Sequence, residues 1–106
     1  MFAVVMLYPQ TSDSHFNFDY FLSVHLTRIR EIFKDLGLVS SQIQAGIGAG
    51  QPGQPAPYAC ICTFTFETLE GFGQGFAQEG AWIMGDIHNY TNVQPLIQIS
   101  NIVVEK

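Results

Sequence analysis

The sequence predicts an α+β fold with the element order β-α-β-β-α-β, in a single domain that spans residues 1–106. Three observations support this fold. Two segments show the apolar spacing of helices, and four shorter apolar segments have the length and composition of strands. A chain of 106 residues also has the usual size of one domain.

The first predicted element is a strand over residues 2–8. Both alternating sets of its side chains are apolar, with Val4 and Met6 on one face and Val5 and Leu7 on the other. We therefore expect this strand to be buried on both faces.

Residues 18–36 form the clearest helix, because their apolar side chains fall on one stripe. His25 lies at the centre of the stripe, which predicts that it faces the sheet. Leu26 lies off the stripe, as does Val24, and this predicts a break or bend between Ser23 and Leu26. The stripe comprises Phe18, Phe21, Leu22, His25, Ile29, Ile32, Phe33 and Leu36.

Two more strands follow, over residues 38–47 and 58–66, joined by a turn at 48–57. The glycines at the start of this turn suggest a phosphate-binding loop, which would require a helix to begin directly after them. Pro52 and Pro55 forbid that helix, so we interpret the segment as a flexible hairpin connection.

The second helix is expected to begin at a Thr68 cap and to end at Gly80. A short helical piece at 81–88 precedes a last strand at 93–104, in which Pro95 favours an edge or strand-start position. This order is the ferredoxin-like pattern, a four-stranded antiparallel sheet with both helices on one face.

The composition points to self-association, since 47% of residues are apolar and only 12% are charged. The sheet face without helices would be wet in an isolated copy, so we expect a homodimer with the two sheets packed together. The net charge of −5 argues against nucleic acid. The short apolar N-terminus can neither span a membrane nor act as a secretion signal, which favours the cytoplasm.

His25 is the candidate catalytic acid or base. Burial should keep its imidazole neutral at pH 7, ready to accept a proton; the alternative is an inert core histidine paired with a backbone carbonyl or a tyrosine hydroxyl. Asp86 and Asn89 are interpreted as capping and turn residues. Cys60 and Cys62 are expected to be buried, inert thiols, and no metal site is predicted. The candidate substrate-binding residues are Tyr20, Phe21, Tyr58, Trp82 and His88.

Four segments, in this order and spacing, resemble the EthD-like proteins, named for ethyl tert-butyl ether degradation. The chain has Phe21 where the family often has tyrosine, and Leu26-Thr27 where the family has a proline. The matching segments are Leu7-Tyr8-Pro9, the aromatic run from Phe18 to His25, the glycine-rich turn from Gly48 to Gly53 followed by Pro57-Tyr58, and Phe66 to Phe72 followed by Gly85 to Thr91.

This resemblance implies a dimeric α+β barrel in which His25 is functional. It also implies a cofactor-independent enzyme of the oxidoreductase, monooxygenase or isomerase type, acting on a small apolar or aromatic compound in degradation or secondary metabolism. Two alternatives remain open: a non-catalytic dimeric protein that binds a small ligand or serves as an accessory, and a haem-binding barrel with His25 as axial ligand. The sequence does not decide whether the domain is an enzyme.

Overall fold

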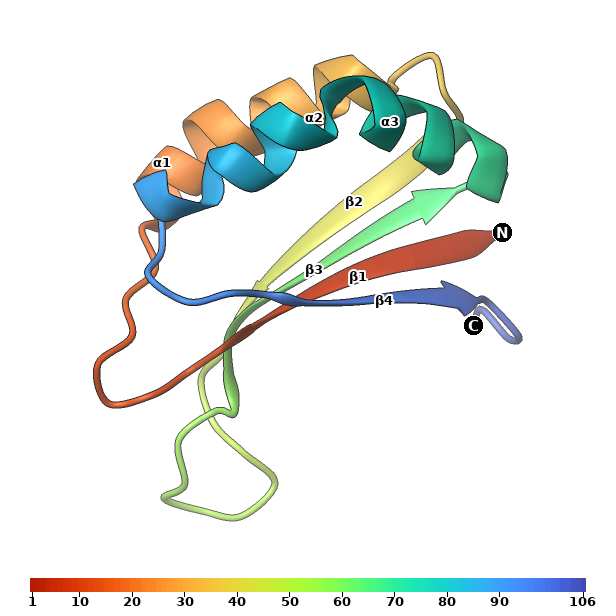
Figure 1. Cartoon of the computed structure of the whole chain (residues 1–106). Coiled ribbons are helices and arrows are strands. Elements are labelled where there is room, and N and C mark those ends of the chain that lie inside the picture. Colours follow the sequence, from red (N-terminus) through yellow and green to blue (C-terminus); the bar gives the residue numbers. More distant parts are fainter.

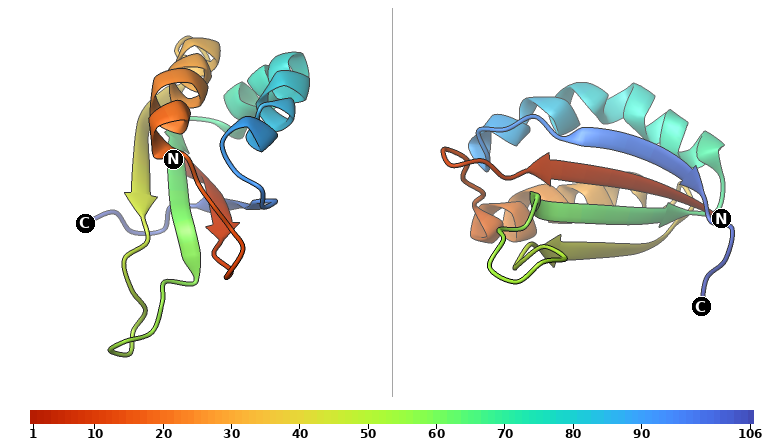
Figure 2. Two further views of the ribbon diagram at one scale, coloured as in Figure 1. Left: turned by 90° about the vertical axis from the view of Figure 1, so that its left-hand side faces the viewer. Right: turned by 90° about the horizontal axis from the view of Figure 1, so that it is seen from below.

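The computed structural model describes all of residues 1–106 and shows one sheet with both long helices on the same face (Figure 1, Figure 2). The strand order is β2-β3-β1-β4, and each neighbouring pair is antiparallel. The predicted ferredoxin-like α+β fold is therefore confirmed. The elements are β1 (Phe2–Pro9), α1 (Phe18–Tyr20), the π-helical turn η1 (Phe21–His25), α2 (Leu26–Phe33), β2 (Leu38–Ala45), β3 (Tyr58–Phe66), α3 (Leu69–Gly85), the 3₁₀ turn η2 (Ile87–Asn89) and β4 (Leu96–Asn101).

The first helical segment contains the predicted irregularity. The backbone N–H of Leu26 donates to the carbonyl oxygen of Phe21, five residues back, which closes a π-helical turn. This wider turn changes the register of the apolar stripe. Leu26 is buried as a result, whereas Leu22, predicted on the buried stripe, is 46% exposed. The prediction for Leu22 was wrong because it assumed a regular period of 3.6 residues.

The second long helix, α3, runs through Gly80 to Gly85, so the prediction that it ends at Gly80 was wrong. A glycine within a helix costs only about 1 kcal/mol and does not by itself end it. Gly80 is buried, with the ring of Phe76 at 3.0 Å from the position of a Cβ atom. The predicted Thr68 cap is confirmed, since its hydroxyl oxygen accepts from the N–H of Gly71.

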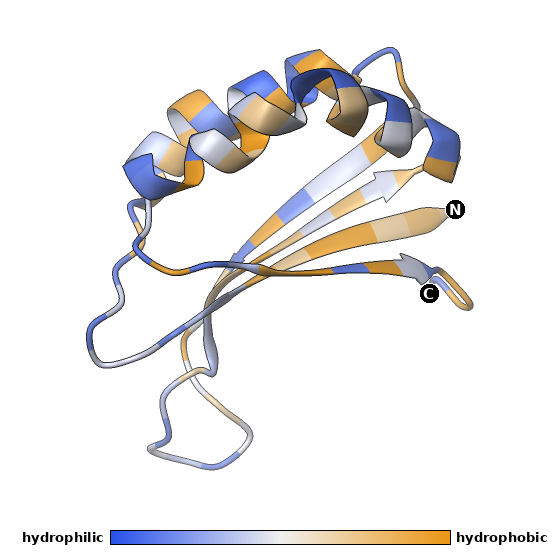
Figure 3. Ribbon diagram, viewed as in Figure 1, coloured by the Kyte–Doolittle hydropathy of each residue, from blue (hydrophilic) through white to orange (hydrophobic).

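The core lies between the two helices and the inner face of the sheet. Val4, Met6 and Tyr8 of β1 point into it. Cys60 and Cys62 of β3 do too, and they are buried free thiols as predicted. Figure 3 shows hydrophobic residues along β1 up to its last residues, which reflects apolar side chains on both faces.

The last strand, β4, is shorter than predicted. It occupies a sheet edge, as expected, but spans only Leu96–Asn101. Pro95 has no N–H to donate to a ladder, so regular pairing starts after it. Beyond Asn101 the backbone N–H of Ile102 still donates to the carbonyl of Met1, and the chain then leaves the sheet.

The outer face of the sheet has no helix over it (Figure 2). Leu7 of β1 lies between two cross-strand neighbours, Ile61 of β3 and Leu96 of β4, so an apolar strip crosses these three strands on this face. Leu7 and Ile61 are only half-buried, and Leu96 is exposed. None of the helices has both the length and the apolar character needed to cross a bilayer.

Candidate functional site

His25 is the last residue of η1 and is 3% exposed. Its imidazole stacks with two aromatic rings, with ring centroids 5.4 Å from Phe21 and 5.3 Å from Trp82. The interplanar angles are 26° and 17°, so the three rings are nearly parallel. These contacts restrict rotation of the imidazole.

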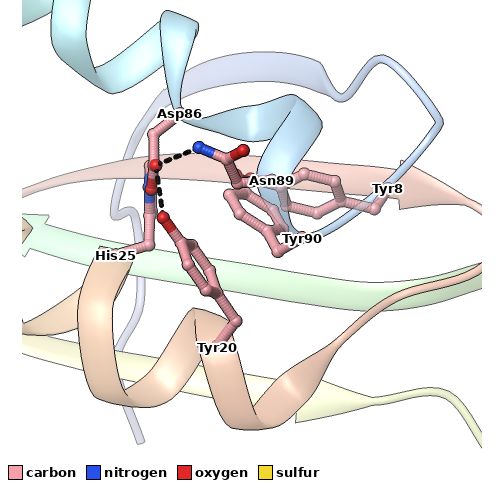
Figure 4. A network of polar contacts seen from close by, with 6 residues as sticks. All are labelled: Tyr8, Tyr20, His25, Asp86, Asn89 and Tyr90. Carbon is pink, nitrogen blue, oxygen red and sulfur yellow. Dashed lines mark hydrogen bonds and ion pairs between the residues drawn. The ribbon is translucent and has the colours of Figure 1, made fainter.

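The carboxylate of Asp86, the residue directly after α3, is the centre of the polar network in Figure 4. Its Oδ2 lies 2.9 Å from Nδ1 of His25. Its Oδ1 accepts from the hydroxyl of Tyr20 at 2.7 Å and from Nδ2 of Asn89 at 3.0 Å. The first helical segment therefore contributes two groups to this carboxylate and the turn η2 contributes one, and Asp86 is itself buried.

These contacts set the charge states of the site. Burial alone would raise the pKa of Asp86, but the hydrogen bonds from Asn89, His25 and Tyr20 outweigh it and lower the pKa. Burial lowers the pKa of His25, and the hydrogen bond to Asp86 offsets this only in part. Donation to Asp86 raises the pKa of Tyr20. At neutral pH the site holds an ionised carboxylate beside a neutral imidazole.

This pairing determines the tautomer of His25. An ionised carboxylate can only accept, so the proton of the neutral imidazole is on Nδ1 and the lone pair is on Nε2. Nε2 makes no hydrogen bond, yet no fully buried side-chain nitrogen or oxygen of the chain lacks a partner. It follows that a water-sized molecule can reach Nε2. The site thus presents an imidazole nitrogen that no other group of the chain uses.

A second polar pair lies beside the imidazole. The hydroxyls of Tyr8 and Tyr90 are 2.7 Å apart, and both residues are buried. The ring of Tyr90 contacts His25 with a centroid distance of 4.8 Å, at an angle of 57°. Burial raises the pKa of both hydroxyls, so they remain protonated.

The structure brings together four of the six predicted site residues, namely His25, Tyr20, Phe21 and Trp82. It does not bring Tyr58 or His88 to them. Tyr58 begins β3 and lines a surface hollow formed by the glycine-rich loop. His88 is exposed on η2 and lines a separate surface hollow.

Sequence reasoning missed the role of Asp86. It does follow α3 as a C-cap, in line with its interpretation as a capping residue, but its carboxylate binds across the fold to His25. The sequence pattern that accompanies this role is the segment Asp86-Ile-His-Asn89-Tyr90. In the structure its 3₁₀ turn brings Asn89 back to the carboxylate of Asp86 and turns Tyr90 inward.

A small apolar pocket of about 30 Å³ lies between the helices and the sheet. His25 does not line it, nor does any other polar residue. A haem group would need a cavity beside His25 that the structure does not have, so we derive no step through haem. No cluster of three metal-ligating side chains exists. The lining residues are Val4, Met6, Ile29, Phe33, Phe64, Phe66, Phe72, Phe76, Ile83 and Ile97.

Comparison with known proteins gives a family model and several structures. The EthD domain model matches residues 9–94. An EthD-like protein from Ralstonia eutropha JMP134 is 28% identical with a TM-score of 0.92, over 99% of this chain and 94% of that chain. An EthD family protein from Bacillus halodurans C-125 is 21% identical with a TM-score of 0.70, over 95% and 97%. A dimeric ferredoxin-like protein from an uncultured marine organism is 13% identical with a TM-score of 0.53, over 100% and 98%. No curated protein matches.

Proposed function

The chain belongs to the EthD domain family, and we propose that it is a cytoplasmic enzyme in which His25 transfers a proton to or from a small, largely apolar organic compound. The observation that carries this proposal is the neutral imidazole whose Nδ1 is held by ionised Asp86 while Nε2 is free. Such a group needs no cofactor to remove a proton. The proposal fits a cofactor-independent reaction of the monooxygenase or isomerase type in degradation or secondary metabolism.

In this mechanism, Nε2 of His25 accepts a proton from an acidic C–H or O–H of the substrate. The positive charge that develops on the imidazole is stabilised by the Asp86 carboxylate at Nδ1 and by the stacked rings of Phe21 and Trp82. Asp86 is a positioning residue, since it holds the tautomer and never contacts the substrate. General-base catalysis of this kind contributes about 10²- to 10⁴-fold to a rate.

Substrate access requires a side chain to move, because His25 lines no pocket. Trp82 covers one face of the imidazole and is itself partly exposed. A rotation of the Trp82 side chain away from the core would uncover that face of the ring. The protein therefore binds its substrate with a rearrangement at the end of α3.

Deuterium exchange tests the proposal without a known natural substrate. The protein is incubated in D₂O with a panel of aryl- and alkyl-substituted 1,3-diketones and β-keto esters, and incorporation of deuterium at the acidic carbon is followed by NMR. The wild type should accelerate exchange of at least one compound. His25→Ala should lose at least 100-fold of that acceleration. His15→Ala, which removes an exposed histidine, is the matched control and should keep it.

Equal exchange rates for wild type and His25→Ala, with a compound that the protein demonstrably binds, would contradict the mechanism. That result would favour a second function, a non-catalytic protein that binds a small ligand. The observation behind this alternative is the separation between His25 and the wholly apolar pocket.

We also propose that the protein is a homodimer that packs through the outer face of the sheet, as a dimeric α+β barrel. The uncovered apolar strip of Leu7, Ile61 and Leu96 supports this, as does the similarity to a protein described as dimeric. Sedimentation equilibrium should show a dimer for the wild type and a monomer for Leu7→Glu. Leu22→Glu, an equivalent change on the exposed helical side, should stay dimeric. A monomeric wild type would refute this part of the proposal.

A further inference from the structure

Trp82 carries the one aromatic ring around His25 that reaches the surface. The indole and the imidazole are nearly parallel, with ring centroids 5.3 Å apart and an interplanar angle of 17°. The other two rings in contact with the imidazole, those of Phe21 and Tyr90, are at most 1% exposed. Trp82 itself is only partly buried. The indole is therefore the part of this aromatic cluster that can leave without unpacking the core.

Open space lies beside Trp82 on the same helix. Gly85 follows it by three residues, so the two positions are neighbours on one face of α3. No atom lies within 4 Å of the place that a Cβ atom of Gly85 would take. Gly85 also lines a surface hollow of about 310 Å³, a size found among pockets that hold small molecules, about 300–1,000 Å³. This hollow offers the indole a place outside the core.

Rotation of Trp82 into the hollow would leave a flat slot against the imidazole of His25. The rings of Phe21 and Tyr90 lie beside the same imidazole, with centroids at 5.4 Å and 4.8 Å. A planar aromatic ring in the slot would recover the stacking that the indole gives up, whereas a puckered aliphatic ring of the same size would not. Such stacking corresponds to about two- to twelvefold in affinity beyond the burial of area.

We propose that the place of the Trp82 indole is a binding subsite for an aromatic group of one or two fused rings, carried by the substrate whose acidic proton goes to Nε2 of His25. This subsite rests on the proposed function and narrows the substrate to aryl compounds. Nε2 belongs to the ring on which the aryl group stacks, so a side chain of a few atoms can bring the acidic carbon to it. The C–H bond breaks, the proton goes to Nε2 and the electron pair stays on the substrate as an enolate. The bound ring takes over from Trp82 in stabilising the imidazolium.

Trp82 is the only tryptophan of the chain, so its fluorescence reports whether a ligand moves it. Ethyl benzoylacetate and ethyl 3-cyclohexyl-3-oxopropanoate differ only in the ring, which is flat and aromatic in the first and puckered in the second. Titration of the wild type with the phenyl compound should shift the emission to longer wavelength in a saturable way, because the indole moves into solvent. The phenyl compound should bind about two- to twelvefold more tightly than the cyclohexyl compound, although the cyclohexyl ring is the more apolar one.

Three variants test the movement of Trp82. Gly85→Leu fills the space beside the indole and should weaken binding of the phenyl compound about tenfold. Gly73→Leu adds the same side chain near the start of α3, where a Cβ atom also meets no neighbour within 4 Å, and should leave binding unchanged. Trp82→Ala removes the side chain that has to leave. Calorimetry should show that it binds the phenyl compound more tightly than the wild type does.

Equal affinity for the phenyl and cyclohexyl compounds would overturn this subsite, as would binding that leaves the emission of Trp82 unchanged. Equal binding by Gly85→Leu and Gly73→Leu would also overturn it, because the ring would then lie elsewhere. The proposed function fails in a different way. Deuterium exchange that depends on His25 but shows no preference for the phenyl compound overturns the aryl subsite alone. Tighter binding of the phenyl compound, with exchange that does not depend on His25, overturns the proton-transfer function alone.

Discussion

Replacing Asp86 by asparagine changes the tautomer of His25 and leaves the shape of the side chain almost intact. Two of the three hydrogen bonds survive, because an amide oxygen can still accept from Tyr20 and Asn89. The third contact does not survive unchanged. The amide nitrogen would face Nδ1 of His25 and donate to it, which moves the imidazole proton to Nε2 and removes the free lone pair.

The magnitude follows from the 2.9 Å contact between Nδ1 and the carboxylate. A hydrogen bond to a charged group contributes about 1.5–3 kcal/mol. Loss of this interaction with the imidazolium corresponds to a decrease of about one to two units in the pKa of His25. Any activity that depends on Nε2 as a base should fall about 10²- to 10⁴-fold.

¹⁵N NMR of histidine-labelled protein measures the tautomer directly, and the chain has only three histidines to assign. The wild type should show a protonated Nδ1 and an unprotonated Nε2 for His25, and Asp86→Asn should show the reverse. Asp35→Asn, at an exposed position, is the control and should keep the wild-type pattern. A wild type with its proton on Nε2, or a variant with an unchanged tautomer and pKa, would refute the reasoning.

Three other predictions concern stability. The pKa of His25 is lowered in the folded protein, so the unfolded chain binds the histidine proton first as pH falls below 6.5. Urea denaturation should therefore show the free energy of unfolding decreasing by up to about 1.4 kcal/mol per pH unit, down to the folded-state pKa. His25→Ala should flatten this slope. Gly75→Ala would place a Cβ atom in steric clash with the ring of Phe33 and should cost about 1–3 kcal/mol in thermal denaturation, whereas Gly73→Ala meets open space and should add about 0.5–1 kcal/mol. Tyr8→Phe and Tyr90→Phe should each destabilise by about 1–3 kcal/mol because each leaves one buried hydroxyl unpaired, and the double variant should be more stable than the sum of the single changes predicts.

The sequence predicts the fold well because its strands and helices differ in period and length. Strict alternation placed β3, and the apolar stripe placed the first helix with His25 facing the core. Departures from regular helix geometry were harder to predict from the sequence. The crowding of Val24 and Leu26 indicated a bend, but it did not show that the bend is a π-helical turn that exposes Leu22.

The site was predictable only in part for a related reason. The burial of His25 and the proximity of Phe21 follow from local periodicity, whereas Tyr20 reaches the same carboxylate only because of the π-helical turn. Its pairing with Asp86 joins residues 61 positions apart, and no local pattern encodes such a contact. The continuation of α3 beyond Gly80 carries Trp82 and Asp86 to the histidine, so the wrong helix end also concealed the partner.

The π-helical turn allows the chain to carry one additional residue while the two ends of the turn keep their facing. A π turn contains one more residue than the α turn that it replaces. Deleting a single exposed residue such as Ser23 would therefore restore an α turn, with Tyr20 and His25 four residues apart and still on one face of the helix. Tyr20 and His25 now bind the same carboxylate from opposite ends of this turn. Both contacts should survive such a deletion, so the polar centre tolerates the loss of this residue.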